Sequence, residues 1–459
     1  MEQKSTFSTR IGVIAATVGS AIGLGNIWRF PAEAQLNGGG AFLIIYIGCV
    51  FLLGIPVMLA EFSLGRAGGS DSVGNIRNLT PNSRWWVAGT IGLIASYLIL
   101  SYYMVVAGWT VEYFADSLTG GLFDGYISGT DAENNRFFAD RMDQYVTTAL
   151  NPLIWTAVVI FFNLAVLLLG VKKGIEKMSN WLMPLMFVLL LVFCAASFSL
   201  PGAMEGVKYF LYPDFSKIDI DVIINALGQA FFSLSLGMGI LVTYSAYYPE
   251  TVNLTRTATT VSLLDFMMAV LMGLIIFPAV TSFGIASDAG EVQGTTLVFI
   301  TMPEIFAAMP APRVWSALFF LLLAVAAITS TISLAEVSVA FVRDRFKVRR
   351  RTACFIVMLP LLATSSLCSL SLGAWPGLSL AGMPLFDFLD TFATNLLLPV
   401  SALLICLYVG WRLPRNFIID QLSNFGTLPA RMASVIAVII RYIAPVLITL
   451  ILVVKLINL

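Results

Sequence analysis

The sequence predicts an all-α integral membrane protein, and three observations support this prediction. Hydrophobic residues make up 58% of the 459 residues and charged residues only 11%, whereas roughly a quarter of the residues in a soluble domain are charged. Eleven apolar runs are long enough to cross a hydrocarbon core of about 30 Å as helices. Two of these runs contain glycine-rich interruptions. We therefore expect one transmembrane domain over residues 1–459 with eleven helices, of which the first and the sixth are broken.

The predicted helices follow one another, and the only lengthy polar segment between them is the loop at 119–150. They cover residues 11–35, 41–65, 86–116, 152–170, 180–199, 222–247, 257–284, 313–342, 353–373, 388–411 and 432–457. Most Lys and Arg residues of the loops lie on the side of the N-terminus. The positive-inside rule then places the N-terminus in the cytoplasm and, with an odd number of spans, the C-terminus outside the inner (plasma) membrane.

The interruptions read "GSAIGLGN" at 19–26 and "SLSLGMGI" at 233–240. They occupy corresponding positions in two halves of five spans, which is typical of an inverted-repeat transporter with its binding site near the bilayer midplane. The first repeat would cover about 11–199, the second about 222–411, and an extra span about 432–457. Glycines also serve as packing contacts between membrane helices. The hydroxyl and amide side chains beside them, and Arg29 just beyond, favour a binding site.

Several function classes are disfavoured by composition. The chain contains no histidine, which removes most zinc sites and Ser-His or Cys-His nucleophiles, so we expect no enzyme. The segment Gly23-Leu24-Gly25 lacks the third glycine and the preceding strand of a dinucleotide fingerprint, and no organic cofactor is expected. The basic stretch "RDRFKVRRR" at 343–351 is explained by topology rather than by nucleic-acid binding. Five cysteines lie within apolar runs and predict no disulfide framework.

A broken membrane helix leaves carbonyl oxygens that protein, water or a bound cation must satisfy. A hard monovalent cation suits such oxygens. Side chains that could complete its shell are Asn26, Ser233, Asp265, Thr329 and Ser330. Hydroxyls in a helix often bond back to the preceding turn instead, but the two interruptions favour the role as ligands.

These segments form a recognisable series: "SAIGLGNIWRFP", "NGGGAFLIIYI", "GIPVMLAEFSLGR", "SYYMVVAGW", "GQAFFSLSLGMG" and "ITSTISLAEV". Over nearly its whole length the chain closely resembles the neurotransmitter:sodium symporter family, in particular its bacterial amino-acid transporters with eleven spans. The resemblance implies a leucine-transporter-like fold. It also implies sodium-coupled, secondary active import of neutral, hydrophobic L-amino acids by alternating access.

The resemblance implies two sodium sites. The first would combine the Ala21 carbonyl, the Asn26 amide, Ser233 and Asp265 with the carboxylate of the substrate. The second would combine the carbonyls of Gly19, Ile22 and Ala326 with the hydroxyls of Thr329 and Ser330.

The resemblance also implies a substrate site between the broken helices. The substrate carboxylate would meet the Gly25 amide and the Tyr103 hydroxyl, and its ammonium group the carbonyls around Ala21, Phe232 and Ser235. Near Ser330, the apolar side chain would meet Leu24, Ile99, Phe232, Met238 and Leu334. Gly23 stands where monoamine carriers have an aspartate, and this leaves room for a substrate that brings its own carboxylate.

Two gates are implied as well. The outer gate would pair Arg29 with Asp390, or alternatively with Asp387, and close over Phe232 and Tyr103. The inner gate would pair Lys4 with Asp344, although the family usually has arginine at the first position. Gly174 and Pro184 match a helix-unwinding motif of the fifth span.

Chloride independence is the last expectation. Eukaryotic members hold chloride with groups that match Tyr46, Gln229 and Ser233, and they usually carry asparagine at the position of Asp265. Asp265 would supply the negative charge itself. A proton-coupled or small-osmolyte carrier on the same scaffold remains the alternative. A receptor is not expected, because the sequence contains no segment that resembles a sensor domain.

Overall fold

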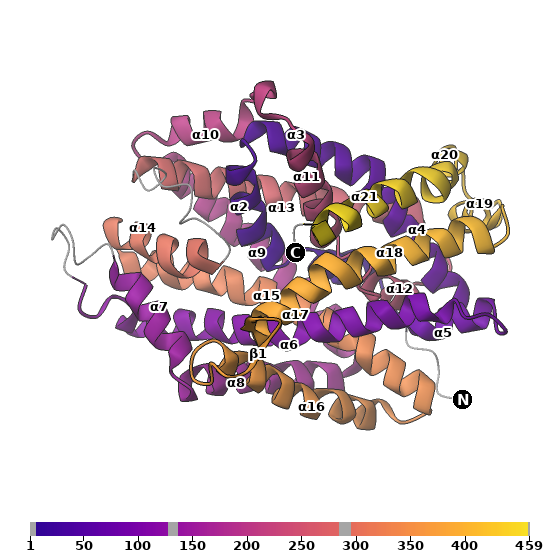
Figure 1. The fold of residues 1–459 in the computed structure, drawn as a ribbon, viewed down its shortest axis with the longest axis horizontal. Coiled ribbons are helices and arrows are strands. Elements are labelled where there is room, and N and C mark those ends of the chain that lie inside the picture. Colours follow the sequence, from indigo (N-terminus) through magenta and orange to yellow (C-terminus); the bar gives the residue numbers. More distant parts are fainter. Residues whose placement is uncertain (1–5, 127–135, 284–294, 458–459) are drawn as a thin grey trace.

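The computed structural model describes residues 6–126, 136–283 and 295–457, and most of its helices run along one direction (Figure 1). Within these ranges, nine helical stretches are long and apolar enough to cross a membrane. They cover Gly40–Gly68, Trp86–Thr119, Leu150–Leu168, Val171–Phe198, Leu254–Ser282, Pro312–Phe346, Arg350–Ser371, Leu385–Arg412 and Ala433–Ile457.

Two further apolar runs are each divided into two helices. In the first, α1 (Arg10–Ala21) is followed after residues 22–24 by the stretch Gly25–Leu36, and the two parts are bent by 55°. In the second, α11 (Ile220–Ser233) and α12 (Ile240–Ser245) are separated by residues 234–239. Both interruptions fall within the glycine-rich segments identified in the sequence. The predicted all-α membrane fold with broken first and sixth helices is confirmed.

The spans comprise regular helices joined or extended by wide π-helical turns. The regular helices are α2 (Phe30–Leu36), α3 (Gly40–Cys49), α4 (Ile55–Gly68), α6 (Trp86–Thr119), α8 (Leu150–Leu168), α9 (Lys177–Phe198), α13 (Leu254–Ser282), α15 (Pro312–Phe346), α16 (Arg350–Ser371), α17 (Leu385–Phe392), α18 (Leu398–Leu407), α20 (Ala433–Val438) and α21 (Ala444–Ile457). The wide turns are η1 (Gly25–Arg29), η2 (Val50–Gly54), η5 (Val171–Glu176), η8 (Leu297–Thr301), η9 (Ala393–Leu397), η10 (Tyr408–Arg412) and η11 (Ile439–Ile443).

The fifth span begins earlier than the sequence predicts. Its helix starts at Val171 rather than near residue 180. The added turns carry Lys172, Lys173 and Lys177, all exposed. A helix can continue beyond the apolar core wherever its side chains reach water, and hydropathy alone does not detect this extension.

Short elements gather at the two ends of the bundle. At one end lie α7 (Phe137–Thr147), α10 (Ala203–Leu211) and α14 (Met302–Ala308), and at the other lie α5 (Ser72–Leu79) and α19 (Phe417–Leu422) (Figure 1). Among the described residues, the one sheet is an antiparallel hairpin of β1 (Ser379–Leu380) and β2 (Met383–Pro384), in which Ser379 faces Pro384. Single 3₁₀ turns cover Gly121–Phe123 and Phe215–Lys217.

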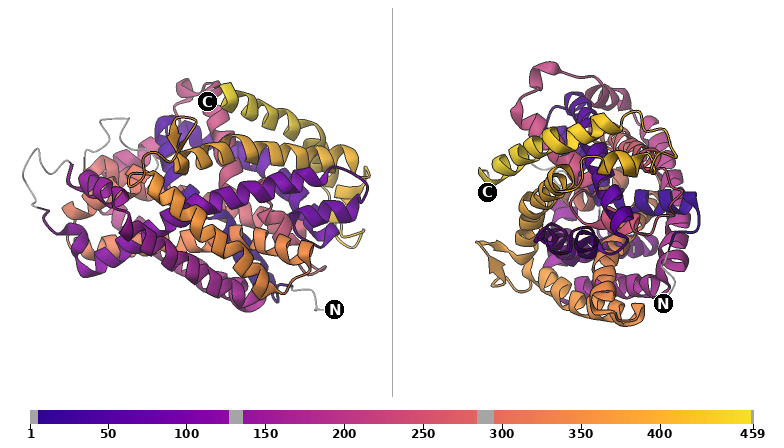
Figure 2. Two further views of the ribbon diagram at one scale, coloured as in Figure 1. Left: turned by 60° about the horizontal axis from the view of Figure 1, so that its bottom comes forward. Right: turned by 90° about the vertical axis from the view of Figure 1, so that its right-hand side faces the viewer.

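The bundle has a buried centre and a lipid-facing rim. In the most apolar part of α15, 83% of the residues are buried, compared with 33% in the last span. The long helices α6 and α15 pack against each other, and α1 contacts α9, α13 and α15. Two further views show helices packed around this centre from all sides (Figure 2). The interrupted helices therefore lie inside the protein, where protein groups can satisfy their free backbone atoms.

Side chains hold the two interruptions open. Glu61, fully buried in α4, accepts a hydrogen bond of 2.7 Å from the Gly237 amide. The Ser235 hydroxyl donates to the Ser20 carbonyl at 2.8 Å, which ties the sixth span to the first. Gly237 has φ of +77°, and a Cβ on it would lie 2.5 Å from the Leu398 carbonyl oxygen. Glycine is required there both for the backbone angle and for the close approach.

We expect Gly237→Ala to lower the thermal midpoint of the purified protein in detergent. A side chain at positive φ costs about 1–3 kcal/mol, and the overlap with Leu398 adds to it. Gly202→Ala is the matched control, since Gly202 has φ of +79° but open space around it. Equal midpoints for the two variants would contradict the role of the close contact.

Candidate functional site

The two interruptions meet at a small, partly enclosed cavity. It is lined by Ser20, Ala21, Gly23, Gly25, Asn26, Ile99, Tyr103, Phe232, Ser233, Ser235, Met238, Ile240, Ser330 and Leu334. These residues come from the first, third, sixth and eighth spans. We call this space the central cavity.

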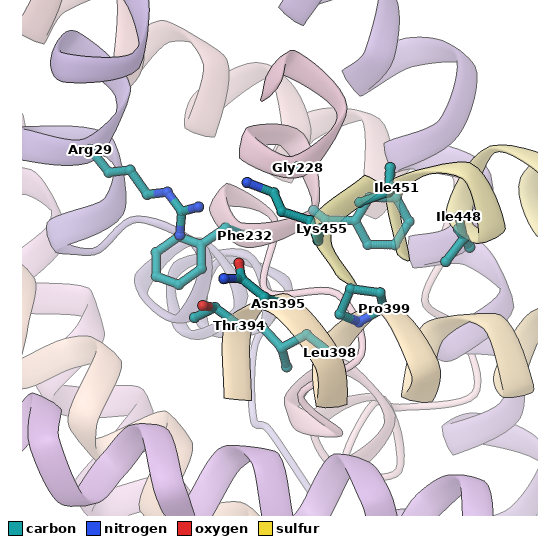
Figure 3. A pocket seen from close by; sticks show the side chains of 11 residues that line it. Arg29, Gly228, Phe232, Thr394, Asn395, Leu398, Pro399, Ile448, Ile451 and Lys455 are labelled. Carbon is teal, nitrogen blue, oxygen red and sulfur yellow. The ribbon is translucent and has the colours of Figure 1, made fainter. Parts of the chain in front are cut away.

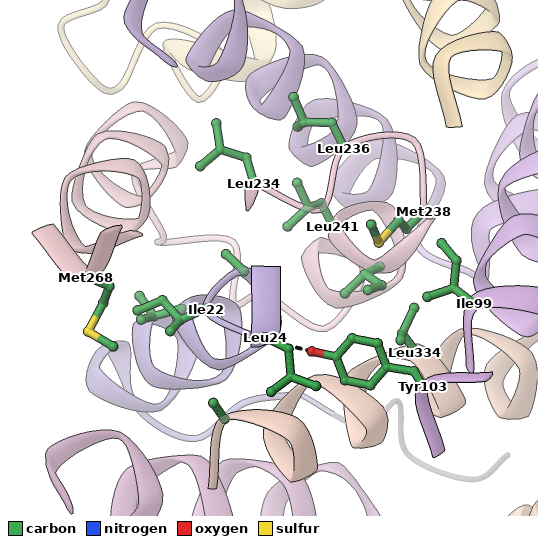
Figure 4. Close-up of a cluster of buried hydrophobic side chains, with 14 of the residues drawn as sticks. Ile22, Leu24, Ile99, Tyr103, Leu234, Leu236, Met238, Leu241, Met268 and Leu334 are labelled. Atoms are coloured by element: carbon green, nitrogen blue, oxygen red, sulfur yellow. Dashed lines mark hydrogen bonds between the residues drawn. The ribbon is translucent and has the colours of Figure 1, made fainter. Parts of the chain in front are cut away.

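Nine of the ten residues proposed from sequence for the substrate line the central cavity, and Leu24 does not. The Leu24 side chain is fully buried in the apolar cluster of Figure 4, and its amide donates to the Tyr103 hydroxyl at 2.8 Å. Its expected place in the wall is therefore corrected. Sequence reasoning missed Ser20 and Ile240. Both flank the interruptions, Ser20 near the end of α1 and Ile240 at the start of α12, and this position was the available signal.

Two glycines lie where a larger side chain would collide with the residues that line the cavity. A Cβ on Gly23 would lie 2.6 Å from the Ser330 hydroxyl oxygen and 2.8 Å from that of Tyr103. A Cβ on Gly25 would lie 2.6 Å from the Phe232 ring. An aspartate at position 23 would need these groups to move, so the polar end of the cavity is shaped for a ligand rather than for a side chain.

Asp265 lies at the centre of a fully buried polar cluster. Its carboxylate accepts hydrogen bonds from the Ser233 hydroxyl at 2.6 Å and from the Asn26 amide nitrogen at 2.8 Å. The Tyr46 hydroxyl lies 3.1 Å from the Ser233 oxygen and 3.4 Å from the carboxylate. The structure thus brings together Asn26, Ser233 and Asp265, three of the four groups expected at the first sodium site. Ala21 lines the same cavity.

Gln229, the remaining counterpart of a chloride ligand, is oriented differently. Its amide nitrogen donates to the Gly25 carbonyl at 3.2 Å. Its oxygen is buried and has no hydrogen-bond partner among the described residues. In this structure Gln229 therefore supports the broken first span.

The groups expected at the second sodium site lie where α1 ends against α15. Ser330 donates to the Ile22 carbonyl at 3.3 Å. Thr329 bonds back to the Ala326 carbonyl at 3.0 Å, and a Cβ on Gly19 would lie 3.5 Å from the Thr329 Cβ. Thr329 thus follows the helix-bonding alternative considered from sequence, whereas Ser330 reaches across to the interrupted helix.

The predicted outer gate is not formed in this structure. Arg29 lies 3.8 Å from Glu33, one turn further along its own helix, and its guanidinium stacks over the Phe232 ring at 4.6 Å. It forms no ion pair with Asp390 or Asp387. An acid four residues along the same helix is always within reach of Arg29. An ion pair with an acid on another span forms only when the two helices are close enough and suitably oriented.

At the residues expected to form the inner gate, the structure shows contacts that sequence reasoning missed. Lys4 lies outside the described residues, and Asp344 pairs with the neighbouring Arg343 at 2.8 Å. The buried carboxylate of Glu176 accepts hydrogen bonds from the backbone amides and the hydroxyls of Ser8 and Thr9. The available signal was an acid inside or beside an apolar run, which in a membrane protein marks a functional position.

A second buried acid on this side is Glu336, which makes a two-pronged ion pair with Arg350 at 2.6 and 2.9 Å. It also accepts a hydrogen bond from the Tyr247 hydroxyl at 2.9 Å. The motif of the fifth span is helical here: Gly174 lies in η5 and Pro184 inside α9.

Broken helices around a partly enclosed, partly polar cavity define a secondary transporter. The chain belongs to the sodium:neurotransmitter symporter family, whose model matches residues 4–128 and 127–459. It is therefore a sodium-dependent, multi-pass membrane transporter and not an enzyme.

Relatives cover nearly the full length. The uncharacterized sodium-dependent transporter YhdH of Bacillus subtilis is 36% identical, with 92% of this chain and 91% of that one aligned. The sodium-dependent serotonin transporter of Drosophila melanogaster is 29% identical over 86% of this chain and 67% of its own. The crystal structure of MhsT in complex with L-phenylalanine matches with a TM-score of 0.86 and 35% identity, covering 99% of this chain and 100% of that one.

We expect Ser233→Ala to destabilise the protein by about 1–3 kcal/mol, because Asn26, Tyr46 and Asp265 each lose a buried hydrogen-bond partner. Thermal unfolding in sodium-free buffer measures this effect without any contribution from ligand. Ser338→Ala is the control, since the buried Ser338 hydroxyl has no partner among the described residues. A midpoint for Ser233→Ala at or above that of the control would contradict the importance of the cluster.

Proposed function

We propose that the chain is a sodium-coupled symporter that imports neutral, hydrophobic L-amino acids by alternating access. The observation that carries this proposal is the lining of the central cavity, which includes hydroxyl, amide and backbone groups together with apolar side chains, but no Asp, Glu, Lys or Arg. Such a cavity suits a ligand with no net charge whose two opposite charges are met by backbone and hydroxyl dipoles. A monoamine would need an acid, and Gly23 supplies none.

In this proposal the substrate carboxylate lies at Gly25 and Tyr103, and its ammonium group faces the carbonyls near Ala21, Phe232 and Ser235. The side chain of the substrate packs against Ile99, Met238 and Leu334, all nearly fully buried. Methionine adapts to different shapes, which suits a range of aliphatic and aromatic side chains. The bound L-phenylalanine of MhsT supports this substrate class.

Two sodium ions would be carried as co-substrates. The first would lie between Ala21, Asn26, Ser233, Asp265 and the substrate carboxylate, and this shared ligand couples the two binding events. The second would lie between the carbonyls of Gly19, Ile22 and Ala326 and the hydroxyls of Thr329 and Ser330. The latter site joins α1 to α15, so sodium at that position favours one arrangement of the two helices over another.

Alternating access would move the broken spans of the two five-span repeats against the surrounding helices. The N-terminus would lie in the cytoplasm and the C-terminus outside the inner membrane, as the distribution of basic residues indicates. When the outer side closes, Arg29 would exchange Glu33 for Asp390 or Asp387. On the inner side Lys4 would pair with Asp344.

The test of this function is uptake of radiolabelled phenylalanine into proteoliposomes with an imposed sodium gradient. We expect wild-type uptake to require sodium and to be inhibited by other neutral, apolar amino acids. The double variant Thr329→Ala/Ser330→Ala removes two proposed sodium ligands and should lose at least about tenfold in uptake. Thr331→Ala is the control, because the Thr331 hydroxyl bonds only to the carbonyl of Ile328. Sodium-driven uptake at the wild-type rate in the double variant would eliminate the second site.

Asp265 should make transport independent of chloride. One carboxylate about 4 Å from sodium contributes roughly 4 kcal/mol of attraction at an effective dielectric near 20, and an amide at this position removes that charge. We expect equal wild-type uptake in chloride and in gluconate, and we expect Asp265→Asn to be inactive or to require chloride. Asp214→Asn, at an exposed position, is the control. Full activity of Asp265→Asn without chloride would refute this role.

A further inference from the structure

We propose that Lys455, on the last span, acts with Arg29 as a cationic entrance that captures the carboxylate of an incoming amino acid. Lys455 would thus be a specificity-determining residue outside the central cavity. This inference rests on the proposed function, since it takes the substrate to be an amino acid.

A second pocket lies beside the central cavity, and we call it the entrance pocket (Figure 3). It combines Arg29 of the first span, Phe232 of α11, Asn395 of η9 and Lys455 of α21. Phe232 lines both spaces. In this proposal the substrate therefore passes the Phe232 ring on the way from the entrance pocket to the central cavity.

The direction of the Lys455 side chain requires an explanation. A lysine near the end of an apolar span ordinarily extends toward the lipid headgroups. Its neighbours Val453 and Leu456 are each 46% exposed on the lipid-facing side. Lys455 is instead half-buried, and its Cε lies 3.9 Å from the position of a Cβ on Gly228. In Figure 3 its amino group points into the same space as the guanidinium of Arg29.

The charges around this space leave it positive. The residues that line the entrance pocket include two cations and no carboxylate. Glu33 acts on both cations, but it lies 3.8 Å from Arg29, and Lys455 forms no hydrogen bond or ion pair with a described residue. The two lining cations and the nearby Glu33 together carry a net charge of +1. Apart from these cations, Thr394 and Asn395 are the only polar side chains of the pocket lining. Two like charges close together repel each other, and a bound anion would reduce this repulsion.

An amino acid with an apolar side chain matches this pocket. Its carboxylate suits the two cations, and its side chain suits the apolar wall of Phe231, Leu398 and Ile451. A positive pocket attracts the carboxylate end of the zwitterion and repels its ammonium end, so the amino acid enters with its carboxylate toward the two cations. The carboxylate would then pass the Phe232 ring, which stacks under Arg29, to reach Tyr103 and Gly25.

The same field acts on sodium with the opposite sign. Lys455 repels sodium, so it does not assist sodium binding. Loss of Lys455 should therefore slow the association of the substrate but not that of sodium. Damage to the fold would slow both. This opposite response distinguishes an electrostatic role from a structural one.

The experiment measures substrate association by stopped-flow fluorescence in sodium-saturated protein, for wild type, Lys455→Gln and Lys455→Arg. We expect Lys455→Gln to reduce the association rate constant for phenylalanine on the order of 3- to 10-fold at low ionic strength, with the dissociation rate unchanged. The difference should vanish at high ionic strength, Lys455→Arg should behave as wild type, and sodium affinity should not fall. Lys208→Gln, an exposed lysine on α10 outside the entrance pocket, should have no effect.

An unchanged association rate in Lys455→Gln would overturn the proposal, as would a reduction that persists at high salt or is matched by weaker sodium binding. A reduction seen in chloride but not in gluconate would also overturn it, because the pocket would then hold chloride rather than the substrate. If no neutral amino acid binds to the wild-type protein, the proposed function fails instead.

Discussion

The unpaired backbone of the two interrupted helices is the constraint on which the rest of this structure depends. In hydrocarbon each unsatisfied amide or carbonyl costs several kcal/mol, so an interruption persists only where protein groups replace the missing helical partners. Glu61 does this for Gly237, Gln229 for the Gly25 carbonyl, and Ser235 joins the two interruptions through Ser20. The long helices α6 and α15 enclose the site, and the glycines let the chain turn there. A cavity lined by backbone dipoles is the result.

A second theme is how charge is handled inside the bundle. Asp265, Glu61 and Glu176 are all buried, and each is held by hydroxyl or amide donors rather than by a basic side chain. Glu336, by contrast, is fully paired with Arg350. The acids with neutral partners lie at the broken helices and at the N-terminal segment. The paired acid lies where two opposite charges join α15 to α16.

Much of this organisation could be read from the sequence, because membrane helices and their interruptions depend on local composition. The positions of α1, α11 and α12 and the gathering of Asn26, Ser233 and Asp265 follow from glycine and polar residues within apolar runs. What could not be read depends on helix rotation and on conformation. The sequence shows an acid at Glu176 but not the amides that it faces. It shows Lys455 near the end of a span but not that its side chain turns inward. Arg29 has several acids in reach, and only the conformation selects Glu33. Leu24 lies beside cavity residues, yet its side chain points into the apolar cluster.

The attachment of Ser8 and Thr9 to Glu176 bears on how the N-terminal segment is held against the bundle. Five donor contacts from two adjacent residues converge on one carboxylate, and Gly12 leaves no space for the chain to shift sideways against it. The backbone amide of Phe7 donates a hydrogen bond to the Tyr247 carbonyl, and its ring packs edge-on against the ring of Tyr244. The bonds from Ser8 and Thr9 share one acceptor, Glu176, and Phe7 adds a contact to Tyr247 from the same short segment. Movement of the N-terminal segment away from Glu176 therefore requires the loss of several buried hydrogen bonds on one carboxylate, each of which costs free energy if it is not replaced.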